Sequence, residues 1–151
     1  MINYTAIQDD LKTILEAGTY TDVPKEIFIE GMEREMLLGN MPFINIRLVS
    51  AVLEIRSLPN GYYGVVLFKI DVVSFNLKSF QEAAITRDRL LRETQLVIQS
   101  NRQFSAGVET SRVGPGVEFS VGIAESGEGQ FQGHVASATT DVIVEVFIEP
   151  A

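Results

Sequence analysis

Cysteine is absent from the 151-residue sequence, and His134 is its only histidine. The first absence excludes disulfides, thiolate nucleophiles, zinc fingers and iron–sulfur ligation together, because each of these needs cysteine side chains. The second limits any Ser-His-Asp triad to one possible base. The fold must therefore be stabilised by packing or by oligomerisation.

Long apolar runs are missing as well. No stretch approaches the roughly 18 consecutive apolar residues that a membrane helix needs. With 46% hydrophobic and 21% charged residues, the composition is still that of an ordinary globular domain. The first ten residues, MINYTAIQDD, carry acids where a signal peptide has its apolar segment, which is typical of a mature cytosolic N-terminus. We expect one domain covering residues 1–151.

Basic side chains are few: 12 Lys and Arg stand against 20 Asp and Glu, for a net charge of −8. Binding to a phosphate backbone comes mainly from clustered Lys and Arg, so tight binding to nucleic acid is disfavoured. Residues 113–151 carry six acidic and no basic side chains, whereas residues 41–112 carry nine basic and six acidic ones. This asymmetry has two interpretations, complementary faces for head-to-tail packing between copies or a solvated acidic surface.

The periodicity of apolar residues predicts a helix near residues 4–17, followed by a short strand over 26–30. In the next strand, residues 43–57, the apolar face changes around Val49 and Ser50, which predicts a bulge there. A proline-and-glycine turn then leads into a return strand over 62–75. That strand is apolar on both faces near its ends, so we expect it to be central in the sheet.

The second half begins with Ser79-Phe80-Gln81-Glu82, the pattern of a helix-starting capping box, and the helix is expected to run to about residue 100 or 103. Alternating valines predict two final strands, around 117–123 and 142–148, joined by a flexible tip over 124–134. The predicted fold class is α+β: a mixed, mainly antiparallel β-sheet flanked by an N-terminal helix and one long central helix, with a C-terminal β-hairpin.

No catalytic or metal-binding pattern emerges. Ser126 and Ser137 lie near His134 in sequence, yet nothing resembles a nucleophile elbow, so His134 is expected to be a surface histidine on a loop. The glycines of the tip have the wrong spacing for a dinucleotide-binding loop, and no lysine follows them. The carboxylates near residue 30 match no EF-hand spacing. We expect no enzyme activity, no cofactor and no metal.

Three segments are candidates for contacts with partners. The methionine-bearing segment 32–42 either covers the core or offers a pliable apolar surface. The long helix carries arginines that are solvated or contact another subunit, and the glycine-rich tip is the third candidate. The candidate residues are Met32, Met36, Met41, Arg87, Arg89, Arg92, Glu125, Glu128, Phe131 and His134.

The succession of elements resembles that of the tail terminator, or tail completion, proteins of tailed bacteriophages, the family that includes the lambda tail terminator. The likeness lies in the opening helix from Ile7 to Leu15, the strand entry Pro42-Phe43-Ile44-Asn45-Ile46, the strand 62–75 running into the capping box at Ser79, and the strand 142–148. It spans nearly the whole chain and rests on element order, length and acidity.

The resemblance implies a structural virion protein of the phage neck, made in the host cytoplasm. Family members form a ring, typically a homohexamer, that caps the tail tube and meets the head-side connector or stopper protein, with DNA passing through the centre without sequence-specific binding. Two alternatives stay open. One is another neck or tail component, a head-to-tail stopper or a tube protein, and the other is a soluble ligand-binding module or an enzyme of unknown class.

Overall fold

The computed structural model describes residues 2–30, 41–55, 62–125 and 132–148. These residues form two helices and a mixed, mostly antiparallel five-stranded sheet, so the predicted α+β fold class and element order are confirmed. In chain order the elements are α1 (Tyr4–Glu16), β1 (Glu26–Ile29), β2 (Phe43–Ile55), β3 (Tyr62–Asn76), α2 (Phe80–Ser100), β4 (Val108–Glu125) and β5 (Gln132–Ile148).

The first helix begins where the Asn3 side chain accepts a hydrogen bond from the Ala6 backbone N–H, at 3.0 Å. Such a side chain satisfies one of the backbone donors that a helix start leaves open. Ile7, Leu11 and Leu15 form the buried stripe of α1. The helix ends at Glu16, close to the predicted end at residue 17.

The second helix begins at the predicted cap, since Ser79 Oγ accepts a hydrogen bond from the Glu82 N–H at 3.2 Å. The other half of a capping box would have the Glu82 carboxylate accept from the Ser79 N–H. That N–H donates instead to Asn76 Oδ1, at 3.2 Å, and the Lys78 N–H donates to the same oxygen at 2.7 Å. Asn76 therefore links the end of β3 to the start of α2.

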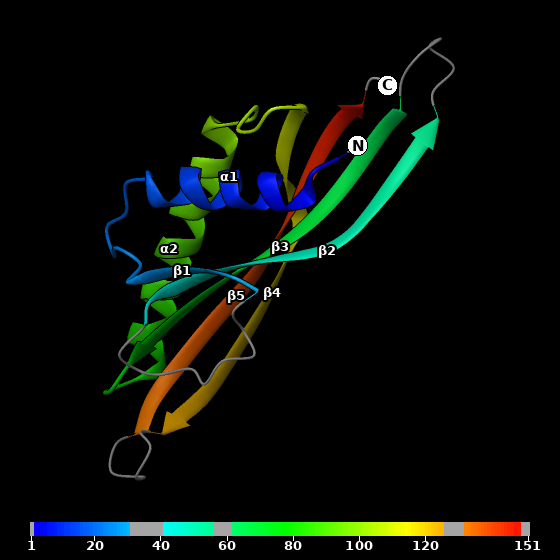
Figure 1. Cartoon of the computed structure of the whole chain (residues 1–151). Helices are drawn as coiled ribbons and strands as arrows, with labels where there is room; N and C mark the ends of the chain where they lie inside the picture. The colour runs from blue at the N-terminus through cyan, green and yellow to red at the C-terminus, as the bar shows by residue number, and fades with distance from the viewer. Residues whose placement is uncertain (1, 31–40, 56–61, 126–131, 149–151) are drawn as a thin grey trace.

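The strands lie in the order β1-β2-β3-β5-β4, so β3 is central as predicted. Only the β1–β2 pair is parallel, and it covers no more of β2 than Phe43 to Ile46. The β2–β3 ladder shifts register between Leu48 and Ser50, which confirms the predicted bulge. Figure 1 shows that β2 and β3 continue well beyond both helices at the upper right.

The C-terminal hairpin is longer than predicted. The pairing of β4 with β5 shifts register between Val113 and Val117, and the two strands stay paired as far as Glu125 and Gln132. The expected tip over 124–134 is therefore wrong at both ends, and residues 126–131 lie outside the described part of the chain. The polar residues and glycines of this stretch are typical of a loop, which is why a loop was predicted. The start of β5 is nevertheless a strand, because β5 pairs with β3 as far as His134, which lies opposite Asn76.

Both helices pack on one face of the sheet (Figure 1). The core between them includes Leu11 of α1, Leu90 of α2 and Phe68 of β3, all fully buried. A smaller cluster of Met41, Phe43, Val73 and Val135 packs on the opposite face. None of the described helices is long and apolar enough to span a membrane.

Candidate functional site

Of the three methionines predicted to form a partner surface, the structure describes only Met41. Met32 and Met36 lie outside the described residues. Met41 is 1% exposed and packs against Phe43, Val73 and Val135. Met41 is thus a core residue, and the interpretation as a pliable partner surface does not hold for it, because a partner cannot reach its side chain.

The arginines of α2 do not form one free basic face. Arg87 Nε lies 2.9 Å from Asp88 Oδ1, and the guanidinium stands 4.8 Å from the centroid of the Phe119 ring. Arg89 Nε lies 2.7 Å from Asp22 Oδ2, which ties α2 to the connector after α1. Arg92 is exposed. Two of the three arginines therefore hold α2 to neighbouring parts of the same chain.

The structure describes only some of the candidate residues around the expected tip. Glu128 and Phe131 lie outside the described residues, and Glu125 ends β4 with a side chain that the structure does not describe. His134 is a strand residue and not the expected loop residue. Its ring meets Phe80 edge-on, with centroids 4.3 Å apart, and its Nδ1 is buried without a hydrogen-bond partner. His134 therefore packs between α2 and the sheet.

Buried polar chemistry is concentrated at Asp71, which is 3% exposed and lies on the face away from the helices. Its carboxylate accepts hydrogen bonds from Arg47 Nε at 2.8 Å and Nη2 at 2.9 Å, from Thr139 Oγ1 at 2.6 Å and from Asn45 Nδ2 at 3.2 Å. The hydrogen bond to Asp71 raises the pKa of Arg47. These hydrogen bonds join β2, β3 and β5 on that face of the sheet.

Within the described ranges, no group of three or more His, Cys, Asp or Glu side chains is placed to hold a metal ion.

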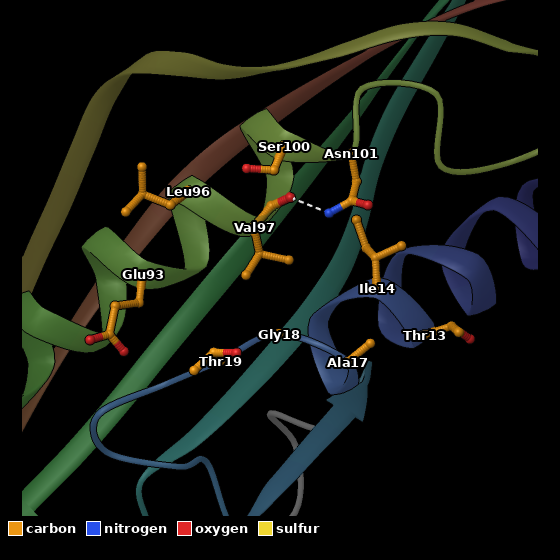
Figure 2. Close-up of a pocket in the computed structure, with 10 residues that line it drawn as sticks. All are labelled: Thr13, Ile14, Ala17, Gly18, Thr19, Glu93, Leu96, Val97, Ser100 and Asn101. Carbon is orange, nitrogen blue, oxygen red and sulfur yellow. Dashed lines mark hydrogen bonds between the residues drawn. The ribbon is translucent and has the colours of Figure 1, made fainter.

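A groove of about 460 Å³ lies between the end of α1 and the C-terminal half of α2 (Figure 2). Glu93 and Asn101 stand at its opposite ends. The Glu93 carboxylate already accepts from the Thr21 N–H at 2.7 Å and from Thr21 Oγ1 at 2.6 Å, and Asn101 Nδ2 donates to the Val97 carbonyl at 2.7 Å. With these polar groups engaged, the groove offers mainly apolar contact, led by Leu96, which is 54% exposed.

The most exposed apolar surface on a strand belongs to β4, at the end of the described sheet. Phe119, Val121 and Ile123 are about 60% exposed, at 59%, 62% and 59%. We call these three residues the apolar row. They pair with Ala138, Ala136 and His134 of β5 and so lie on the helix side of the sheet, where Arg87 of α2 covers part of the Phe119 ring.

Among the residues that the structure describes, β2 forms a second edge. β1 pairs with Phe43 to Ile46, and the Leu48 N–H donates to Glu30 Oε1 at 2.7 Å, so residues 49–55 have a described partner strand only on the β3 side. Leu48, Val49 and Val52 are 36%, 46% and 58% exposed. The alternation of apolar residues predicted both strands, but alternation alone does not show which face or edge lacks a cover, so neither surface was among the predicted candidates.

No protein-family model matches the sequence, and no curated protein matches it either. The geometry of the surfaces and the resemblance in element order are therefore the basis for a functional proposal.

Proposed function

We propose that this chain is a structural subunit that assembles with copies of itself into a ring, and that the ring terminates a phage tail tube and joins it to the head-side connector. The observation that carries the proposal is a pair of sheet edges without a described partner strand, β4 and residues 49–55 of β2, each with exposed apolar side chains. Two different edges on one chain suit head-to-tail contacts, which close into a ring when the rotation between copies closes.

The apolar row supports assembly because proteins that stay monomeric usually protect their sheet edges. They do so with lysine, proline, short strands or a covering segment. The first part of β4 contains Pro115 and a register shift between Val113 and Val117, which protect that part of the edge. The stretch from 117 to 125 contains neither lysine nor proline. Exposed isoleucine, valine and phenylalanine on such an edge favour pairing with another chain.

The charge of the chain suits a ring through which DNA passes. The net charge is −8, and residues 113–151 contain no basic side chain. An acidic lumen repels phosphate, so DNA would slide through it without binding. In this proposal the partners are further copies of the chain, the tail tube protein and the head-side connector protein, and the chain has no enzyme activity or cofactor.

The experiment is to add the purified chain to self-assembling tail tube protein from the same genome and to image the products by negative-stain electron microscopy. We expect rings alone and rings capping tube ends, with shorter tubes as the chain is added, because a capped end no longer grows. A chain that forms no rings with or without tube protein, and leaves tube length unchanged, would contradict the proposal. Rings that form but do not bind tube ends would support self-assembly and rule out the terminator role.

A further inference from the structure

The directions of the two edge strands indicate how copies meet. We propose that residues 49–55 of β2 in one copy pair with the outer edge of β4, along residues 117–123, in the next copy. The occupant of each edge is thus a second copy of this chain. This inference rests on the proposed ring and names the contact that builds it.

The strand directions fit such a contact. β2 and β5 both run antiparallel to β3, and β4 runs antiparallel to β5, so β4 runs opposite to β2. In a cyclic ring all copies have the same orientation relative to the axis. When the strands run along that axis, β4 of one copy meets β2 of the next in antiparallel fashion, and the alternation inside each copy continues across the seam.

The exposed apolar area on the two edges can be compared with that of a specific interface. At roughly 150–200 Å² for each large apolar residue, three residues that are about 60% exposed contribute on the order of 300 Å² from the apolar row. The exposed apolar residues of β2 add on the order of 200 Å² by the same reasoning. The two contributions sum to about 500 Å² of apolar area, about half of the roughly 1,000 Å² that a specific interface needs, and interfaces are somewhat more than half apolar.

The position of the two edges sets how far neighbouring copies are offset along the strands. Within one copy, Ala51 lies level with Ser111 across β3 and β5. For residues near Ala51 to pair with residues C-terminal to Ser111 in the next copy, that copy must be offset by several residues along the strand direction. Closed barrels with tilted strands show the same kind of offset.

The absence of cysteine allows a direct test by cross-linking. Ala51 is exposed and lies on the helix side of β2, as its pairing with Val66 shows. Ala51→Cys is combined, in three separate variants, with Val117→Cys, Val121→Cys or Ile123→Cys on the same side of β4. We expect at least one double variant to give a ladder of disulfide-linked oligomers after mild oxidation. The single variants serve as controls and should give no ladder.

Two outcomes would overturn this seam. The first is an oligomeric protein in which none of the three double variants forms a ladder. The second is complete dimer formation by Val121→Cys alone, because it would show that β4 pairs with β4 across a two-fold axis.

A charge variant gives a second measurement. Val121→Lys places a lysine on an edge residue that is 62% exposed, so folding should be retained and pairing blocked. We expect the mass from light scattering to fall from that of the ring to that of one chain, about sixfold for a hexamer. Val23→Lys, at a residue 69% exposed in the connector after α1, is the control and should leave the ring intact.

These outcomes separate the two proposals. If Val121→Lys still forms rings, the seam is wrong and the ring function stands. If the wild-type chain is a monomer under every condition, the proposed function itself fails.

Discussion

Tyr20 shows how single residues hold α1 to the rest of the molecule. Its hydroxyl donates to the Leu15 carbonyl at 2.6 Å, and a Cβ on the nearby Gly18 would stand 2.6 Å from Val97 Cγ2. Burial, together with the neighbouring Glu93 carboxylate, raises the pKa of Tyr20 from 10.0 to about 12. The folded chain therefore holds this phenol proton more tightly than the unfolded chain.

This pKa leads to a prediction about alkaline pH. Between pH 10 and 12 the unfolded state releases the proton while the folded state keeps it, so the free energy of unfolding falls, by on the order of 2 kcal/mol. Tyr20→Phe removes this loss, although it lowers stability at pH 7 by about 1 kcal/mol because the Leu15 carbonyl loses its donor. Urea unfolding at a series of pH values measures both effects. Equal losses in the two proteins above pH 10 would contradict the assignment.

The Asp71 network predicts a non-additive pair of substitutions. Arg47→Met leaves a buried carboxylate with fewer donors and should cost about 2–4 kcal/mol in the free energy of unfolding. The Arg47→Met, Asp71→Asn double variant should be less destabilised than the sum of the two single variants, because it no longer buries an unpaired charge. Thermal unfolding of the four proteins measures the coupling. Strict additivity would show that the ion pair contributes nothing of its own.

At the scale of elements, the start of α2 combines a predicted feature with one that the sequence did not reveal. The serine cap was predicted, and the structure confirms it. The return bond from Glu82 is replaced by Asn76, which serves the Ser79 N–H from the end of β3. The connection from β3 to α2 is thus held by Asn76 at the end of β3 and by Ser79 at the start of α2.

Ser79→Ala should therefore lower the free energy of unfolding by about 1 kcal/mol, since Ser79 caps the helix. Glu82→Gln should change it by only a few tenths of a kcal/mol, because only its favourable position near the helix dipole is lost. Chemical denaturation measures both variants. A larger effect for Glu82→Gln than for Ser79→Ala would mean that the carboxylate, and not Asn76, completes the cap.

The elements differ in how far the sequence predicted them. Local signals were sufficient for α1, for the bulge after Leu48 and for the serine cap, since each depends on neighbours within a few residues. The length of β4 and β5 was underestimated because their polar ends are held by pairing with distant strands. The candidate surfaces were missed for a similar reason. How far Phe119 is covered depends on where α2 packs on the sheet, and a short sequence pattern does not contain that information.

The whole molecule is a long sheet with its two helices gathered on one face, which leaves strand edges and strand ends without cover from the helices (Figure 1). A sheet of this kind can add strands from other chains at both edges. The apolar row on β4 and the open part of β2 are where we expect this to happen. In our proposal assembly follows from this architecture, and the acidic C-terminal part suits the proposed ring around DNA.

The most direct test of this central claim is the mass of the purified chain in solution, measured by native mass spectrometry over a range of concentrations. One chain has a mass of 16.7 kDa. We predict a dominant closed species, at about 100 kDa if the ring holds six copies, with no open-ended series above it. A single species at 16.7 kDa at every concentration, with or without tube protein, would contradict the account.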